Sequence, residues 1–256
     1  MAKGGVLLEP LILLVIGGTF LLAGMVKGVI GLGLPTVSLA LLTLALDLPQ
    51  AMALLLVPSF VTNLWQALAG GRAREIARRL WPFMLMATVT VWLGARALTR
   101  VDLNLLSALL GGLLVTYSMI SLAGVRFSLS PSQEAWLGPV IGLANGILTG
   151  MTGSFVVPGV LFLQAIGLSR DLLIQAMGML FTVSTLALAV ALQSNCFLSV
   201  DLMAVSSAAL IPALLGMVLG QRIRARLSEA VFRRVFFIAL LVLGGYIIAG
   251  ALGGYG

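Results

Sequence analysis

The stretch that decides the fold is LMAVSSAALIPALLGMVLGQ, residues 202–221, followed directly by Arg222, Arg224 and Arg226. An uncharged, mostly apolar run of about 20 residues is long enough for one helix to cross a bilayer. The whole chain has this character, since 61% of its 256 residues are hydrophobic and 9% are charged, against about 25% charged in a typical soluble domain. So few charges cannot cover a soluble fold of this size. The sequence therefore predicts a membrane protein.

Further uncharged runs lie along the rest of the chain. They cover residues 10–26, 28–46, 48–71, 80–95, 103–125, 135–169, 172–200 and 235–256. The run 135–169 is too long for one span, and its glycines favour a break near 149–153. We therefore expect an all-α polytopic membrane protein with about ten apolar helical segments (8–10), some of them broken or re-entrant at glycine clusters.

Two loops, 70–79 and 222–234, hold nine of the fifteen lysines and arginines. Because Lys and Arg concentrate in cytoplasmic loops, both loops are expected on the cytoplasmic face. Counting spans from 70–79 brings the chain back to the inside at 222–234 and places both termini outside. Arg96 and Arg100 are the exceptions to the rule. The pattern predicts a multi-pass protein of the cell inner (cytoplasmic) membrane.

Composition also excludes several classes of function. The net charge of +7 does not indicate nucleic-acid binding, because the basic residues lie between spans. The single cysteine, Cys196, excludes an intramolecular disulfide and a CxxC metal site. The sequence has no histidine and no carboxylate deep in a predicted span, so an intramembrane enzyme would lack its reactive groups. We expect no catalytic residue, no metal, no cofactor and no cleavable signal peptide.

Two glycine clusters divide the chain into similar halves. The first is Gly24-x3-Gly28-x2-Gly31-x-Gly33, and the second is Gly142-x3-Gly146-x3-Gly150-x2-Gly153. Glycine is common in membrane helices because it allows close packing, but the matching order of the two clusters favours a repeat. Residues 1–124 and 125–256 would then be two transmembrane repeats of about five segments each. An odd number of spans makes the second repeat inverted, which is a recurring plan in transporters.

The glycine cluster that opens each half resembles that of the TauE/SafE family of sulfite and organosulfonate exporters. The resemblance extends to Pro158 and to Gly216-Met-Val-Leu-Gly220 in the second half. It implies a secondary transporter that exports small sulfur-containing anions, such as sulfite or the sulfonate sulfoacetate, across the inner membrane. It does not choose among these anions.

Polar side chains gather at the same places as the glycines. Helix N-termini offer free N–H donors and the positive end of a dipole to an anion, glycine lets the backbone approach a ligand, and hydroxyls and amides donate hydrogen bonds. Serine and threonine also join helices to one another, but the group as a whole favours a site. The predicted substrate-binding residues are Lys27, Gly28, Gly31, Gly33, Thr62, Asn63, Asn145, Gly146, Thr152, Gly153, Ser154, Gln175 and Thr182.

Lys27 admits two interpretations, as a cation of the substrate site or as a side chain that reaches the lipid headgroups. With no Asp, Glu or His inside a span to relay protons, export is expected to follow the membrane potential. The alternatives are an importer or a channel for other small organic or inorganic anions, and a membrane scaffold. The expected partners are a small anionic substrate and membrane lipid, without nucleic acid, and a homodimer is left open.

Overall fold

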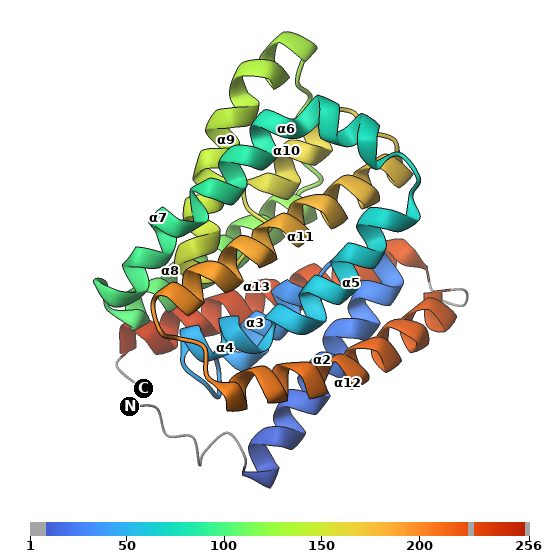
Figure 1. Ribbon diagram of the computed structural model, residues 1–256. Helices are drawn as coiled ribbons and strands as arrows, with labels where there is room; N and C mark the ends of the chain where they lie inside the picture. The colour runs from blue at the N-terminus through green and yellow to red at the C-terminus, as the bar shows by residue number, and fades with distance from the viewer. Residues whose placement is uncertain (1–8, 225–227, 254–256) are drawn as a thin grey trace.

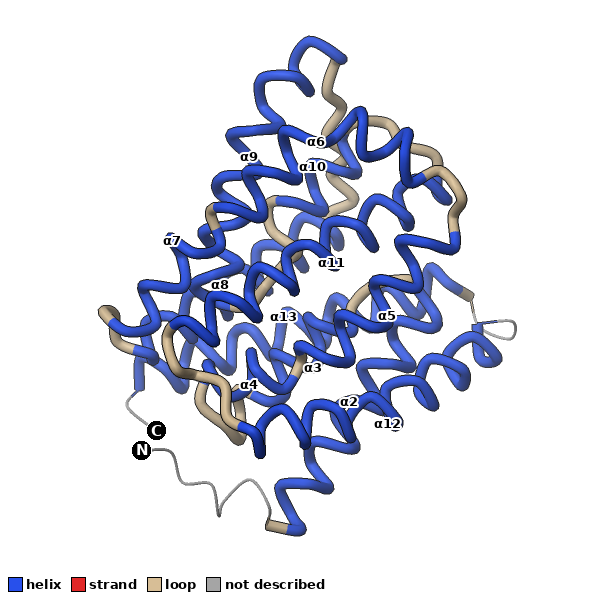
Figure 2. Tube along the Cα trace, viewed as in Figure 1, coloured by secondary structure: helices blue, strands red, loops and turns tan. Residues whose placement is uncertain are grey.

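The computed structural model describes residues 9–224 and 228–253, and every regular element in these ranges is helical (Figures 1 and 2). The first half contains α2 (Pro10–Ile30), α3 (Leu34–Leu42), α4 (Leu48–Leu54), α5 (Leu56–Ala69), α6 (Ala73–Val89), α7 (Val91–Ala95), the 3-10 helix η1 (Arg96–Thr99) and α8 (Leu103–Leu122). The second half contains α9 (Pro131–Thr152), α10 (Gly159–Ala165), α11 (Arg170–Ser194), α12 (Val200–Arg224) and α13 (Glu229–Gly253). The all-α prediction is confirmed.

Fewer helices qualify as membrane spans than the sequence predicts. Within the described ranges, six stretches are long and apolar enough: Pro10–Ile30, Ala73–Thr99, Leu103–Leu122, Arg170–Ser194, Val200–Arg224 and Ala230–Gly253. The pair α4 and α5, bent by 44° at its junction, is a seventh candidate. The prediction of about ten segments exceeds this number because α3 has nine residues and α10 seven, and a helix rises only about 1.5 Å per residue.

Both glycine clusters end a helix. α2 stops at Gly31, whose φ of 80° is left-handed, and Gly33, with a φ of 108°, precedes α3. α9 stops at Gly153, with a φ of 73°. Residues that carry a side chain rarely adopt these φ values, so glycine is needed at both breaks. The break predicted near 149–153 is therefore confirmed.

α2 packs along α12, and glycines bring the two backbones into contact. A methyl group added at Gly24 would collide with the carbonyl of Ala213, and one added at Gly28 would collide with the carbonyl of Met217. Small residues are the usual means of close helix packing in membranes, where no hydrophobic force draws helices together. The first helix is thus fixed to a helix near the end of the chain.

α9 packs along α6 and α7 by the same means. A methyl group at Gly142 would collide with the carbonyl of Phe83, and one at Gly150 would collide with the carbonyl of Val91. The long helix that opens the second half is therefore held by elements of the first half. Because α2 is in turn held by α12, the two halves of the chain interlock.

The remaining long helices form two antiparallel pairs. α5 and α11 run side by side in opposite directions through the middle of the bundle (Figure 1). α8 packs against α13. The start of α8 lines one cavity with the end of α13, and the end of α8 lines another with the start of α13. This pair is therefore antiparallel as well.

Basic loops meet at one end of the bundle, called here the basic end. The end of α5, Asp171 at the start of α11 and Arg224 at the end of α12 line a single cavity. The loops 70–79 and 222–234 thus lie on one side, as the positive-inside rule predicts. Arg226, in the second of these loops, lies outside the described residues.

Candidate functional site

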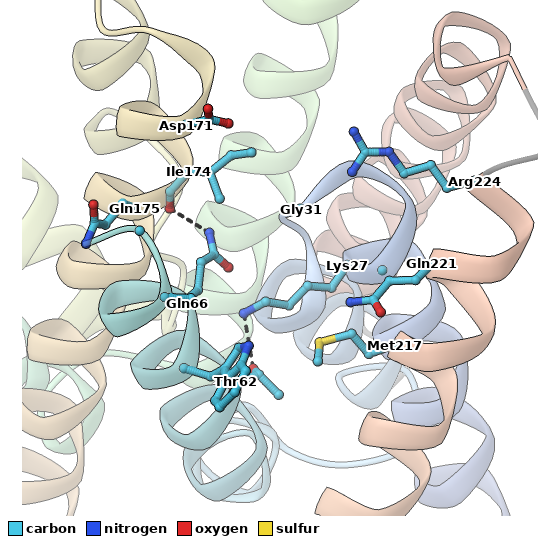
Figure 3. Close-up of a pocket in the computed structure, with 14 residues that line it drawn as sticks. Lys27, Gly31, Thr62, Gln66, Asp171, Ile174, Gln175, Met217, Gln221 and Arg224 are labelled. Atoms are coloured by element: carbon cyan, nitrogen blue, oxygen red, sulfur yellow. Dashed lines mark hydrogen bonds between the residues drawn. The ribbon is translucent and has the colours of Figure 1, made fainter. Parts of the chain in front are cut away.

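A cavity of about 690 Å³ lies between α2, α5, α11 and α12 at the basic end (Figure 3). It is a candidate site because four helices from both halves of the chain meet there and because polar groups line it. Its lining residues are Lys27, Gly28, Gly31, Thr62, Trp65, Gln66, Ala69, Gly70, Asp171, Ile174, Gln175, Met217, Gln221 and Arg224. Five of the predicted site residues, Lys27, Gly28, Gly31, Thr62 and Gln175, are among them.

Lys27 points into the bundle, and only 5% of its surface is exposed. Its ammonium group donates a hydrogen bond to Thr62 Oγ1 over 3.1 Å and another to Asn63 Oδ1 (Figure 3 shows the Thr62 side of this contact). Between the two interpretations of Lys27, the structure therefore supports a place at the cavity and not a reach to the headgroups. α2 continues as a helix to Ile30, so the side chain starts one turn before the break.

The partners of Lys27 are neutral. Two ion pairs join the side chains in the described part of the chain, Arg72 with Glu75 and Arg79 with Glu134, and neither includes Lys27. A buried ammonium without a counter-charge is costly, because hydrogen bonds to neutral oxygens replace only part of its hydration. Lys27 is therefore buried at the cavity without an acidic partner among the described side chains.

The two partners of Lys27 are themselves held in place. Thr62 Oγ1 donates to the carbonyl of Pro58 over 2.8 Å, which leaves its lone pairs to accept from Lys27. Asn63 is fully buried, and its Nδ2 has no hydrogen-bond partner in the described residues. Since Asn63 Oδ1 faces the ammonium, the amide keeps a free donor near a positive charge. The hydroxyl hydrogen of Thr62 is thus already used, and Asn63 Nδ2 is the donor left over in this group.

Two glutamines join α5 to α11 beside the cavity. Gln66 Nε2 donates to the carbonyl of Ile174 over 2.7 Å, and Gln175 Nε2 donates to the carbonyl of Ala67, also over 2.7 Å. The Oε1 of Gln175 accepts from the backbone N–H of Arg72 at 3.2 Å. Gln175 lines the cavity as predicted, but its amide is engaged at both ends. Its visible role is to hold the two helices together.

Apart from Gln175, the predicted residues of the second half lie outside the lining of this cavity. Asn145 Oδ1 accepts from the backbone N–H of Gly159 at 2.9 Å, while Asn145 Nδ2 is buried without a partner in the described residues. Thr152 Oγ1 donates to the carbonyl of Leu148 and accepts from the backbone N–H of Ser154. These contacts tie the end of α9 to the segment leading into α10.

The other predicted residues also have structural contacts. Gly146 packs against Thr90 and the backbone of Ala87, and Gly153 packs against Met52 and Leu39. Gly33 lies against Val26 and Phe236, and Thr182 donates to the carbonyl of Gly178. Asn63 accepts a hydrogen bond from Lys27 but does not line the cavity. The other predicted residues that are absent from the lining are Gly33, Asn145, Gly146, Thr152, Gly153, Ser154 and Thr182.

Several lining residues escaped the sequence-based prediction. Gln66 follows Thr62 by one helical turn, so helical periodicity applied from Thr62 would have found it. Gln221 and Arg224 lie in the last turns of α12, a region that the sequence indicated as the edge of a loop. Trp65 and Met217 carry no polar signal and depend on tertiary packing.

The described residues contain no group of three or more His, Cys, Asp or Glu side chains able to hold a metal ion. The charged side chains that line the cavity are Lys27, Asp171 and Arg224, and its polar side chains include Thr62 and the amides of Gln66, Gln175 and Gln221.

Comparison with known proteins gives one result. The family model described as "Sulfite exporter TauE/SafE" matches residues 16–247, which is nearly the whole chain. Members of that family are membrane transporters and not enzymes. Neither a curated protein nor a solved structure matches the chain.

Proposed function

The chain belongs to the TauE/SafE family of sulfite exporters, and we propose that it exports small sulfur-containing anions, sulfite or sulfonates such as sulfoacetate, from the cytoplasm. The observation that carries this proposal is Lys27, a buried cation with neutral partners at a cavity on the basic end. An intramembrane charge that faces a cavity usually marks a substrate pathway. The multi-pass helical fold supplies the path through the membrane.

The anion would bind where the ammonium group and the cavity meet. Sulfite and sulfonate oxygens accept charge-assisted hydrogen bonds, which are roughly twice as strong as neutral ones. Lys27 would supply the charge, and Thr62 and Asn63 would fix the position of the ammonium. Gly28 and Gly31 line the same cavity, so the α2 backbone is accessible to the ligand.

We further propose that residues 1–124 and 125–256 are inverted repeats of about five segments each. The packing supports this, because α2 lies on α12 in the way that α9 lies on α6 and α7. The central pair α5 and α11 is antiparallel, as a pair exchanged by inversion must be. In transporters of this plan the two halves form the substrate path together. Asn145, Gly146, Thr152, Gly153, Ser154 and Thr182 would belong to the half-site that opens to the outside.

Export would follow the membrane potential. The carboxylates of the described helices lie in their first turns, as Glu75, Glu134, Asp171 and Asp201 do, and are not placed to relay protons across the membrane. A monovalent anion leaving a cell that is negative inside gains about 2.3 kcal/mol per 100 mV. Efflux from proteoliposomes should therefore increase with an imposed potential. A strict need for a pH gradient at clamped voltage would contradict this mechanism.

The direct test is anion efflux from proteoliposomes, with sulfite, sulfoacetate, isethionate, taurine, acetate and phosphate compared at equal concentration. The wild-type protein should transport sulfite or a sulfonate at least ten times faster than acetate or phosphate. Lys27→Met should abolish this difference, and Lys27→Arg should retain part of it. Arg96→Met, which removes an exposed charge, is the matched control.

Two results would contradict the proposal. Equal rates for all six anions would favour the alternative, an importer or channel for other small organic or inorganic anions. Normal sulfite transport by Lys27→Met would remove the cavity from the transport path. An unchanged rate in Arg96→Met is needed in either case to show that net charge alone has no effect.

A further inference from the structure

A second cavity, of about 630 Å³, lies between the end of α8 and the start of α13. Arg233 and Arg234 line it from α13, and Ser121 and Leu122 line it from α8. It shares no lining residue with the cavity at Lys27. We call it the α8–α13 cavity.

Neither arginine has an acidic partner among the side chains that the structure describes. Both are exposed, and the ion pairs among the described side chains, Arg72–Glu75 and Arg79–Glu134, involve neither of them. The planar guanidinium group matches phosphate oxygens in a bidentate manner and is weakly hydrated, so arginine is well suited to bind phosphate. Arg233 and Arg234 are successive residues of α13. Together with the hydroxyl of Ser121 from α8 they give the cavity a polar lining with a formal charge of +2.

The floor of the cavity is apolar and firmly packed. Phe237 is buried, and its ring meets that of Tyr117 edge to face at a centroid distance of 5.2 Å. Ile238, the next residue of α13, also lines the cavity and is 46% exposed, so it presents an apolar surface there. A ligand here would meet charge at one end and hydrocarbon at the other.

The positive-inside rule and the uncharged run of α13 indicate that this cavity lies near the lipid headgroups on the cytoplasmic side. The uncharged run of α13 begins at residue 235, directly after Arg234, and α13 is a candidate span. The loop that follows α8 exposes Val125 (51%) and Phe127 (52%) on either side of Arg126. Apolar side chains interleaved with a basic residue are typical of a segment that lies in the membrane interface.

We propose that the α8–α13 cavity binds the phosphate headgroup of an anionic phospholipid from the cytoplasmic leaflet. That leaflet carries the anionic lipids, and basic pockets between membrane helices on this side are suited to their headgroups. Arg233 and Arg234 hold the phosphate, Ser121 donates to it, and an acyl chain runs along Ile238. The bound lipid joins α8 of the first half to α13 of the second.

The test measures lipid binding to the purified full-length protein by native mass spectrometry, with phosphatidylglycerol and phosphatidylcholine as probes. Wild type should retain phosphatidylglycerol in preference. Arg233→Ala/Arg234→Ala should bind it roughly 30-fold more weakly, since each arginine near an anionic surface contributes about a factor of five. Arg74→Ala/Arg78→Ala removes two exposed charges at the same end of the bundle and should change binding little.

Three outcomes would overturn the proposal. These are equal retention of both lipids by wild type, an equal loss in the two double variants, and full competition by millimolar inorganic phosphate, which would mark a site for free phosphate. If Arg233→Ala/Arg234→Ala does not fold, Arg234→Ala and Arg233→Lys/Arg234→Lys decide. The double lysine substitution keeps the charge without the bidentate geometry and should also weaken binding. Sulfite transport by these variants is measured separately, so a failure here does not bear on the transport proposal.

Discussion

The two glycine breaks are alike in backbone and different in chemistry. Each ends a long helix at a left-handed glycine, Gly31 in the first half and Gly153 in the second. One turn before the first break stands Lys27, which faces a cavity, whereas Asn145 near the second break accepts from the backbone of Gly159. The comparison teaches that glycine determines where each helix ends. The side chain that precedes the glycine determines whether a basic group at a cavity or a hydrogen-bonded amide lies near the break.

The largest effect on stability is expected when a charge is placed near the second glycine break. Asn145→Lys puts an ammonium at a fully buried position that is not part of the lining of the Lys27 cavity. An uncompensated buried charge costs about 3–5 kcal/mol, so we expect a large loss of thermal stability and of purified yield. Thermal unfolding in detergent measures this. Wild-type stability in Asn145→Lys would mean that the two breaks are chemically equivalent.

The next test removes the charge near the first glycine break. Lys27→Met should raise the stability of the anion-free protein by about 1–4 kcal/mol, because an apolar side chain of similar size replaces a buried ion without a counter-charge. It should also lose the stabilisation that sulfite gives to wild type. Thermal shift with and without sulfite separates the two effects. Destabilisation of the anion-free variant would show that Lys27 is needed for folding and would weaken its assignment to the substrate.

A third test asks whether the two halves are packed equally. Gly220→Ala and Gly150→Ala each place a methyl group against a backbone carbonyl, that of Met25 and that of Val91. Overpacking of this kind costs about 1–3 kcal/mol, and the two losses should agree. Gly17→Ala is the control, since nothing lies within 4 Å of a methyl group there. Equilibrium unfolding measures the loss of stability. A loss in only one variant would show that the α2–α12 contact and the α7–α9 contact are not packed equally tightly.

The smallest effect on stability is expected for the side-chain hydrogen bonds between α5 of the first half and α11 of the second. Gln66→Ala removes the hydrogen bond to the carbonyl of Ile174, and such bonds contribute about 0.6 kcal/mol on average and at most about 1.7 in membrane proteins. Gln175→Ala, which removes two bonds, should cost about twice as much. Unfolding midpoints test both variants. A reversed order would mean that Gln66 has contacts beyond this bond.

The breaks could be predicted from the sequence because glycine clusters in apolar runs have a local cause. The number of spans could not, because the apolar run 28–46 contains both the end of α2 and the nine-residue α3, and hydropathy does not report helix length. The direction of Lys27 depends on Thr62 and Asn63, which are 35 and 36 residues away. No local pattern contains that information.

The site was predictable from the sequence only where its residues belong to a local pattern. Lys27, Gly28 and Gly31 belong to a recognisable cluster, and all three line the cavity. Gln221 and Arg224 reach it because α12 packs on α2, which the charge pattern alone does not indicate. Asn145, Thr152 and Ser154 of the second half lie elsewhere, because their hydrogen bonds tie α9 to the segment leading into α10, and the sequence motif does not indicate those contacts.

The glycine seam between α2 and α12 has a consequence for the time course of synthesis. Gly24 meets Ala213, and at roughly 5–20 residues per second the ribosome reaches the second residue about 10–40 s after the first. During that interval α2 lacks the helix against which Gly24 and Gly28 pack in the structure. α9 has no such delay, because its partners α6 and α7 are made before it. α2 can therefore reach its final packing only after α12 has been made, whereas α9 can pack as soon as it is made.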